Sequence, residues 1–308
     1  MRTNEQVLSR MAEDLKLRGL AAGTQIDYIM HARLFLDWAN RPAETMDEEN
    51  IRQYLNYLIS DKKLCVSTVN TYNAALRFLF AVTMNRTLNY RQIPRLKQTR
   101  SLPEILNKNE VAQIFDCANS LRNKAILMTI YGAGLRISEV CNLKVRDIDS
   151  ESMRIFIRCS KDGKDRYTLL SQINLDILRE YWKAYRPNHP EEWLFLTKRG
   201  TKFNEKTARD VFDSTVKRTS ITKDITPHTL RHCFATHLLE DGYSLFQIKE
   251  MLGHASLSST TVYLHLANTT AGVISPADSR NFRYAKTGCA RPCSSGSLIS
   301  KKFEDFLL

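Results

Sequence analysis

The sequence predicts a mainly α-helical protein with a small β-sheet, divided into two domains. Its 308 residues exceed what one hydrophobic core usually holds, because cores rarely grow beyond about 250 to 300 residues. Apolar residues recur at helical spacing through most of residues 1–270, while one segment alternates with the period of two that a half-buried strand requires. A basic stretch without a single acid separates the two helical regions.

Residues 1–85 are expected to form an all-helical domain of four helices. The first ends at Gly19, the second is capped by Thr24, the third follows Thr45 with an acidic first turn, and the fourth covers residues 67–82. The predicted apolar face of the second helix is Ile26, Ile29, Met30, Leu34, Phe35 and Trp38, and that of the third is Ile51, Tyr54, Leu55 and Leu58.

Residues 86–103 are interpreted as a basic linker. The segment contains a proline, and its like charges favour an extended form that would lie well along a phosphate backbone. An ordinary solvated connector is the alternative. The basic residues proposed to contact DNA are Arg86, Arg91, Arg95, Lys97 and Arg100.

Residues 104–270 are expected to form a second, α+β domain. Residues 153–159 alternate as a strand, Gly163 marks a turn, and residues 166–170 return as the partner strand. Lys161 and Lys164 are therefore predicted at the tip of a hairpin. Further helices follow, with three short capped segments between residues 227 and 266, and the pattern is lost beyond Gly272.

Composition limits the classes of function. The net charge of +12 and pI near 9.4 favour a polyanionic partner, with nucleic acid first and a merely soluble basic protein as the alternative. Seven cysteines are an odd number and form no disulfide framework, which indicates a reducing compartment. Neither a signal peptide nor a membrane-spanning stretch is recognised, so we expect a soluble protein that makes no contact with a membrane.

The segment around His228 predicts an anion site. Thr226 caps a helix with Pro227 as its first residue, so that His228 and Arg231 share one face at the positive end of the helix dipole. His232 and His237 are predicted to be packing residues of this helix. A zinc site built from these histidines is disfavoured, because no glutamate lies between His228 and His232 to act as a base and the guanidinium would repel the ion.

Two further segments carry candidate chemistry. Arg136 follows a glycine turn that fails as a dinucleotide fingerprint, and Glu139 at i+3 is placed to orient it. His254 follows Gly253, which is suited to end a helix, and Tyr263 lies nine residues later in a helix that Ser258 or Ser259 would cap. A lone tyrosine at helical spacing is usually a packing residue, so the case for Tyr263 depends on its companions.

Together these motifs closely resemble those of the tyrosine recombinase, or phage integrase, family. The family boxes are present as Gly134-Leu135-Arg136-Ile137-Ser138-Glu139, His228-Thr229-Leu230-Arg231-His232, Leu252-Gly253-His254 and Tyr263-Leu264-His265, in the family's order and spacing. The resemblance spans about residues 1–270. It implies a SAM-like core-binding domain at the N-terminus, followed by an α+β catalytic domain of the tyrosine-recombinase type.

The resemblance also implies a role for each site residue. Tyr263 would be the nucleophile, His228 the general base, and Arg136, Arg231 and His254 the groups that bind the phosphate. Lys161 would protonate the departing 5′-oxygen. The family often has a Gly-Lys-Gly turn where this chain reads Ser160-Lys161-Asp162-Gly163-Lys164, so Lys164 stays an alternative to Lys161. The implied product is a 3′-phosphotyrosyl bond, formed without metal, cofactor or ATP.

The implied partners are double-stranded DNA with specific recombination sites and further copies of the chain, as a homo-tetramer with a dimer on each site. A cytoplasmic, nucleoid-associated protein is expected. Residues 271–308 are proposed to dock on a neighbouring protomer through Phe303, Phe306 and Leu307. A type IB topoisomerase and a catalytically silent DNA-binding regulator are the rival interpretations. Integration, transposition and replicon resolution stay open as biological tasks, as does the DNA sequence.

Overall fold

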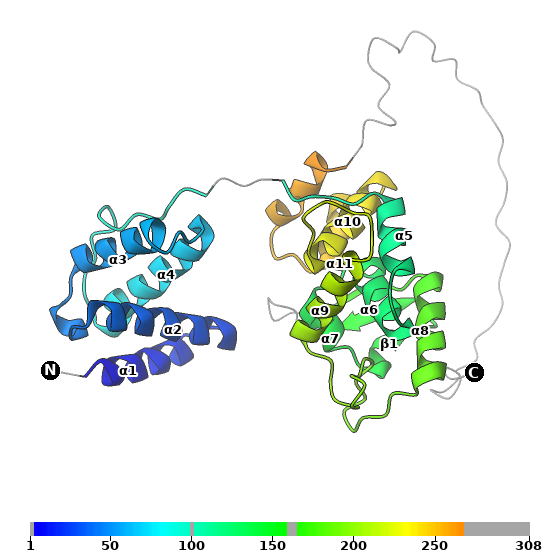
Figure 1. The fold of residues 1–308 in the computed structure, drawn as a ribbon, viewed down its shortest axis with the longest axis horizontal. Coiled ribbons are helices and arrows are strands. Elements are labelled where there is room, and N and C mark those ends of the chain that lie inside the picture. Colours follow the sequence, from blue (N-terminus) through cyan, green and yellow to red (C-terminus); the bar gives the residue numbers. More distant parts are fainter. Residues whose placement is uncertain (1–2, 99–101, 159–164, 268–308) are drawn as a thin grey trace, which may run out of the picture. The chain divides into compact units, whose positions relative to one another are not determined.

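The computed structural model describes residues 3–98, 102–158 and 165–267. The chain divides into two compact units, Met1–Ser101 and Leu102–Leu308 (Figure 1). The first unit is all helical, and the second contains helices and one small sheet. The predicted fold class, mainly α with a small β-sheet, is therefore confirmed.

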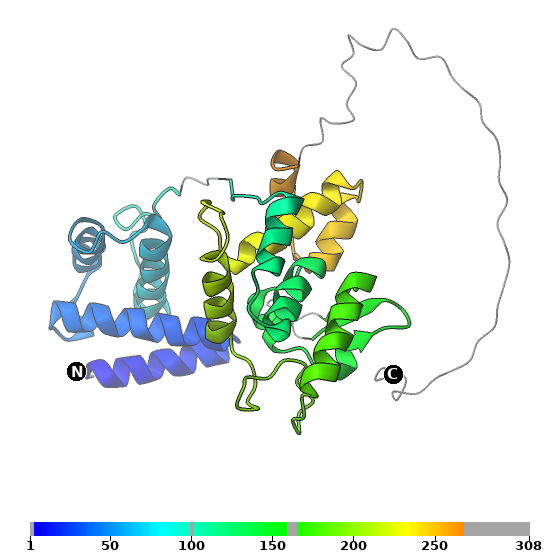
Figure 2. The same cartoon turned by 45° about the vertical axis from the view of Figure 1, so that its right-hand side comes forward.

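The first unit contains the four predicted helices. They are α1 (Asn4–Leu17), α2 (Ala22–Ala39), α3 (Glu48–Ser60) and α4 (Val66–Phe78), with a 3₁₀ turn η1 (Ala43–Thr45) and a π turn η2 (Leu79–Thr83). Helices α1 and α2 lie side by side in both views (Figures 1 and 2). The buried face of α3 is the predicted one, and Asp47 caps the helix by accepting a hydrogen bond from the Asn50 amide.

Helix α2 corrects two predictions. It begins at Ala22, so Thr24 lies inside the helix and is not its cap. Of the predicted apolar face, Phe35 is buried, but Ile26 is 67% exposed and Met30 is 46% exposed. The buried residues are His31, Ala32, Phe35 and Leu36. Because α2 is apolar around much of its circumference, its contacts with α1 and α4 select the buried stripe, which periodicity alone does not reveal.

Most of the predicted linker packs against the first unit. Leu88 and Ile93 are buried in the core of that unit. The Arg86 guanidinium donates hydrogen bonds to the carbonyl oxygens of Glu44 and Met46, so these contacts occupy it within the first unit. Arg91, Arg95 and Lys97 are exposed. Arg100 lies outside the described residues.

The second unit is built around α6. Its helices are α5 (Lys108–Asp116), α6 (Leu121–Gly132), α7 (Ile137–Cys141), α8 (Gln172–Tyr185), α9 (Glu205–Val216), α10 (Pro227–Glu240) and α11 (Leu245–Leu252), with 3₁₀ turns η3 (Val145–Asp147), η4 (Leu257–Ser259) and η5 (Thr261–His265). Helix α6 packs against α5, α7, α8, α9 and α10 (Figure 1). Its buried residues, among them Ile126 and Ile130, occupy several faces, as a central helix requires.

The sheet contains the predicted strand pair. Strands β1 (Ile148–Asp149), β2 (Arg154–Ile157) and β3 (Arg166–Leu169) are antiparallel in the order β1-β2-β3. Ile155 and Ile157 are buried and Arg154 is exposed, as the alternation predicts. Strand β1, with two residues, was too short to show a pattern in the sequence. Lys161 and Lys164, which the sequence predicts at the tip of the hairpin, lie outside the described residues.

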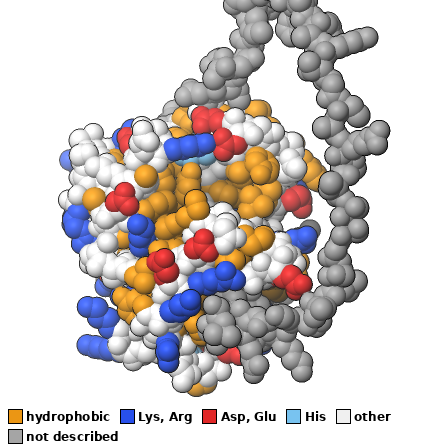
Figure 3. Space-filling view, turned by 90° about the vertical axis from the view of Figure 1, so that its right-hand side faces the viewer, with side chains coloured by type: hydrophobic (Ala, Val, Ile, Leu, Met, Phe, Trp, Pro, Cys, Tyr) orange, Lys and Arg blue, Asp and Glu red, His pale blue; other side chains and the backbone are white. Residues whose placement is uncertain are grey.

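The surface of the second unit carries several large apolar side chains. Tyr167 is 55% exposed and Ile173 is 71% exposed. Figure 3 shows a face of the molecule on which apolar side chains collect with charged ones scattered among them. Among the described residues, none of the helices combines the length and apolar character needed to cross a membrane.

Candidate active site

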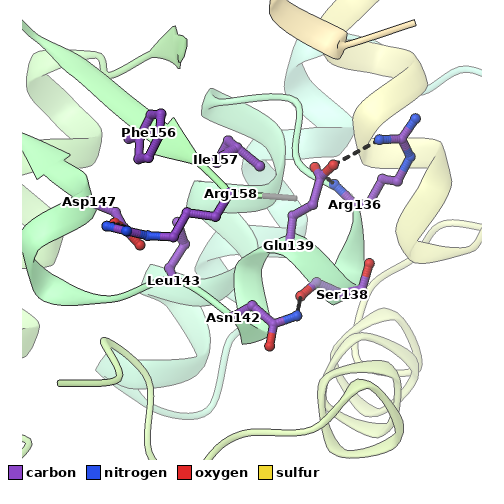
Figure 4. A pocket seen from close by; sticks show the side chains of 9 residues that line it. All are labelled: Arg136, Ser138, Glu139, Asn142, Leu143, Asp147, Phe156, Ile157 and Arg158. Atoms are coloured by element: carbon purple, nitrogen blue, oxygen red, sulfur yellow. Dashed lines mark hydrogen bonds and ion pairs between the residues drawn. The ribbon is translucent and has the colours of Figure 1, made fainter. Parts of the chain in front are cut away.

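The site begins at the turn that leads into α7. Gly134 has a φ of +62°, and Arg136 is the residue that precedes the first turn of the helix. The Glu139 carboxylate accepts hydrogen bonds from the Arg136 amide and from its guanidinium, both at 2.8 Å. Figure 4 shows the two side chains pointing toward one another. The predicted contact between Arg136 and Glu139 is therefore confirmed.

Two more arginines reach the same carboxylate from distant parts of the chain. Arg166, on β3, donates two hydrogen bonds to Glu139, at 2.9 and 2.8 Å. Arg231, on α10, has a guanidinium nitrogen 3.5 Å from Glu139 and donates to the carbonyl oxygens of Gly134 at 2.7 Å and Leu252 at 2.6 Å. Three guanidinium groups thus surround one carboxylate, and we call Arg136, Arg166, Arg231 and Glu139 the arginine cluster.

The arginine cluster carries an excess of positive charge. Burial opposes ionisation of Glu139, but the hydrogen bonds and charge of Arg166, supported by the Arg136 amide and the charge of Arg231, hold its pKa at about 2. Burial and the neighbouring Arg136 charge lower the pKa of Arg231 to about 10, which leaves it protonated at neutral pH. Two positive charges therefore remain uncompensated by carboxylates within the cluster, which favours a bound anion.

Two glycines let the backbone come close to the cluster. Gly253 ends α11 with a φ of +65°, and a Cβ there would lie 2.7 Å from Arg166 Cδ. A Cβ at Gly134 would lie 2.3 Å from the Phe234 ring. The end of α11 thereby presents the Met251 and Leu252 carbonyls to the guanidinium groups of the cluster, where a helix C-terminus stabilises cations.

His254 lies beside the cluster. Its Nδ1 is 3.0 Å from the Thr260 hydroxyl. Burial, followed by the charges of Arg231, Arg136 and Arg166, lowers the pKa of His254 to about 4. The imidazole is therefore neutral at physiological pH and has one N–H to donate.

Tyr263 lies in the 3₁₀ turn η5, and not in a helix capped by Ser258 or Ser259 as predicted. Its side chain is 2% exposed, and its ring is nearly parallel to that of His254 at a centroid distance of 6.5 Å. Burial raises the pKa of Tyr263, while the charges of Arg231 and Arg136 act in the opposite direction. The phenol is therefore protonated at neutral pH and feels the field of the arginine cluster.

The histidines of α10 separate into different environments. His228 is exposed in the first turn of the helix. His237 is a packing residue, as predicted, because its ring nitrogens contact the Leu106 carbonyl at 3.0 Å and the Tyr131 hydroxyl at 2.9 Å. His232, predicted to be a packing residue, has its Nδ1 3.1 Å from the Tyr263 hydroxyl.

The structure thus brings together Arg136, Arg231, His254 and Tyr263, while Lys161 falls outside the described residues. The sequence interpretation missed Arg166. One signal could have found it, because Arg166 and Thr168 occupy the inward positions of a strand, where a charge requires a buried partner. Within the described part of the chain, no group of three or more His, Cys, Asp or Glu residues could hold a metal ion.

A cavity of about 310 Å³ opens beside the arginine cluster (Figure 4). Arg136 and Glu139 line one side of it, and the ion pair of Arg158 with Asp147 lines another. Ser138 and Asn142 add polar groups to its wall. Leu143, Phe156 and Ile157 complete the wall, so the cavity presents two arginines and two carboxylates among apolar side chains.

Comparison with known proteins agrees with this chemistry. Residues 104–270 match the phage integrase family, and residues 7–90 match the N-terminal SAM-like domain of phage integrases. A putative integrase/recombinase of Sinorhizobium fredii, y4qK, is 39% identical over 273 residues, which cover 87% of each chain. The tyrosine recombinase XerA of Pyrococcus horikoshii is 33% identical over 84% of this chain and 89% of its own.

Solved structures show the same fold. The crystal structure of a XerA recombinase has 26% sequence identity and a TM-score of 0.52, over 86% of this chain and 96% of its own. The Tn1549 transposon integrase in complex with a circular intermediate DNA has a TM-score of 0.69 at 18% identity, over 83% of this chain and 94% of its own.

Proposed function

The chain belongs to the phage integrase family of tyrosine recombinases, which are DNA strand-transferring enzymes, and from that premise we propose that it breaks and rejoins DNA at specific sites through a covalent bond to Tyr263. The observation that carries the proposal is the excess positive charge of the arginine cluster beside a buried phenol. Displacement at a phosphodiester spreads negative charge over the non-bridging oxygens, which is the charge that such a cluster stabilises.

Each residue has a part in the proposed reaction. Arg136 and Arg231 bind the non-bridging oxygens, since guanidinium groups match the geometry of phosphate. His254 donates an additional hydrogen bond from the ring nitrogen that does not face Thr260. Tyr263 loses its proton to His228 as its oxygen attacks phosphorus, and the bond from phosphorus to the 5′-oxygen breaks.

Lys161 supplies the proton for the departing 5′-oxygen, with Lys164 as the alternative donor. The product is a 3′-phosphotyrosyl bond and a free 5′-hydroxyl. Because the ester bond is conserved, the hydroxyl of another strand can reverse the step without ATP. The cations of the site take the part that a metal ion plays in many other phosphoryl-transfer enzymes.

The proposed partners follow from this chemistry. Exchange of four strands in pairs requires a homo-tetramer, with a dimer on each DNA site. Arg91, Arg95 and Lys97 are exposed and basic, which supports contact with the phosphate backbone. The proposed site of action is the cytoplasm, at the nucleoid. The tail at residues 271–308, proposed to dock on a neighbouring protomer, lies outside the described residues.

A nicked-duplex trapping assay tests the proposal. The full chain first selects a duplex from a random-sequence pool. That duplex is then nicked, so that cleavage releases a short DNA fragment and the strand cannot be rejoined. Wild-type protein should form a covalent adduct that survives denaturation, and Tyr263→Phe should bind the duplex but form no adduct.

Two other results would overturn the proposal. Relaxation of a supercoiled plasmid by single protomers, without exchange between two sites, would identify a topoisomerase. Tight binding with no adduct under any condition would identify a regulator that has kept the scaffold.

A further inference from the structure

The contact between His232 and Tyr263 has no part in the reaction described above. His232 Nδ1 lies 3.1 Å from the Tyr263 hydroxyl, with ring centroids 5.8 Å apart and the ring planes inclined by 50°. The histidine comes from α10, and the tyrosine comes from η5, 31 residues later. The contact therefore joins two elements at the atom that would attack the DNA.

The direction of this hydrogen bond depends on the tautomer of His232. Burial, followed by the charges of His228 and Arg231, lowers the pKa of His232 to about 4, so its imidazole is neutral at physiological pH. Burial keeps Tyr263 protonated. A protonated phenol is a donor, and a neutral imidazole has one nitrogen that accepts. We assign the tautomer with the imidazole proton on Nε2, in which the phenol O–H donates to Nδ1.

We infer that His232 is a positioning residue for the nucleophile, which accepts the hydrogen bond of the Tyr263 hydroxyl and fixes the direction of the phenol oxygen relative to the arginine cluster. This inference rests on the proposed function, since it gives Tyr263 the part of the nucleophile. It assigns a separate task to His228, which remains the general base.

The geometry of α10 supports a positioning role. Arg231 and His232 are consecutive, so their side chains leave the helix in different directions. Arg231 reaches the carbonyls of Gly134 and Leu252, while His232 reaches η5. One rigid helix thus holds both a phosphate-binding group and the partner of the nucleophile. A 3₁₀ turn such as η5 has poorer hydrogen-bond geometry than an α-helix, so a contact from outside the turn adds to the packing that holds its tyrosine.

Position matters at this atom because a misplacement of about 1 Å can slow an enzyme by about 100-fold. His237 provides a matched control on the same helix. His237 is buried and bonded at both ring nitrogens, but its partners are Leu106 and Tyr131 and neither is Tyr263. A loss that is merely structural should appear in variants of both histidines, and a loss of positioning should appear only in variants of His232.

The first experiment observes the phenol directly. 3-Fluorotyrosine is placed at position 263 of the full chain, and its ¹⁹F resonance is recorded for wild type and for His232→Ala, His232→Gln, His232→Asn and His237→Asn. The amide of asparagine occupies about the place of Nδ1, whereas that of glutamine occupies about the place of Nε2. We expect the resonance to move and broaden with alanine and glutamine, and to stay near the wild-type position with asparagine and in the His237 variant.

The second experiment measures single-turnover adduct formation on the nicked duplex that the protein selects from the random pool. We expect His232→Ala to slow cleavage by ~10- to 100-fold and to leave the affinity for the duplex within about twofold of wild type. His232→Asn should recover most of the rate, and His237→Asn should cleave at nearly the wild-type rate wherever it is folded.

Two results would overturn the inference. The ¹⁹F resonance could be unchanged in His232→Ala, or the His232 and His237 variants could lose cleavage in proportion to their loss of stability. Should His232→Ala fail to fold, the comparison of the asparagine and glutamine variants decides, because only the positioning role distinguishes the two ring nitrogens. Failure of wild-type protein to form any adduct would defeat the proposed function, whereas the ¹⁹F result alone would still show whether His232 holds the phenol.

Discussion

Replacing Glu139 by glutamine should destabilise the second unit at neutral pH. The carboxylate is the negative group of the arginine cluster, and its contacts with Arg166 and Arg231 are buried on both sides. Glutamine keeps the shape of the side chain but removes its charge. The guanidinium groups then repel one another in a poorly solvated environment, without the carboxylate that offsets them.

The pKa of Glu139 gives the magnitude. It lies at about 2 in the folded protein and at 4.5 for the free side chain, and ~1.4 kcal/mol for each pH unit gives a contribution of ~3 kcal/mol. This agrees with the ~3 to 5 kcal/mol that removal of one partner of a buried ion pair costs. Because the folded pKa is the lower one, the contribution is complete above pH 4.5 and is lost as the pH falls from 4.5 toward about 2.

Urea unfolding between neutral and acidic pH measures this contribution. A Trp38→Phe background leaves Trp182 and Trp193 as the remaining tryptophans, so that fluorescence reports the second unit alone. Glu139→Gln should lose ~3 kcal/mol at neutral pH, and the difference from wild type should shrink on acidification. Glu151→Gln, which changes an exposed carboxylate in the turn after β1, is the control. Equal unfolding free energies for wild type and Glu139→Gln at neutral pH would refute the reasoning.

Three further perturbations test other parts of the structure. Arg166→Lys removes the paired hydrogen bonds to Glu139 and should lower the unfolding free energy by ~1 to 3 kcal/mol in the same urea assay, because an ammonium cannot reproduce a two-pronged contact. Gly253→Ala should lower the midpoint of thermal unfolding and slow adduct formation, since its Cβ would lie 2.7 Å from Arg166 Cδ; an unchanged midpoint would contradict this. Ile26→Gln with Met30→Gln should change the unfolding free energy of the first unit, followed by circular dichroism, by less than ~1 kcal/mol, whereas a loss of several would mean that these side chains are buried.

The features that the sequence predicted well are determined by near neighbours. The caps of α10 and α11, the buried face of α3 and the contact of Arg136 with Glu139 each depend on residues within about one or two helical turns. The strand pair likewise follows from an alternation and a turn within one short segment. Such patterns are visible in a single sequence because the interacting residues are close along the chain.

The features that the sequence missed depend on contacts between distant segments. Arg166 reaches a carboxylate 27 residues earlier, and His232 reaches a hydroxyl 31 residues later. In α2, apolar residues lie on more than one face, so only the packing of α1 and α4 decides that Phe35 is buried and Ile26 is not. Family motifs marked the candidate residues and the local partner Glu139, but not the partners that reach them from distant segments.

The three guanidinium groups of the arginine cluster are not equivalent, and the difference follows from how each is compensated. Arg231 and Arg166 are 5% and 7% exposed, and both also donate to carbonyl oxygens at the end of α11. The carbonyl dipoles at that helix end therefore stabilise their charges in addition to Glu139. Arg136 is 17% exposed and lines the cavity. An entering phosphate should therefore meet Arg136 first and Arg231 after it, while Arg166 acts mainly through the electrostatic field that it maintains. Substitution of Arg136 should consequently weaken anion binding with little loss of stability, whereas substitution of Arg231 should reduce both.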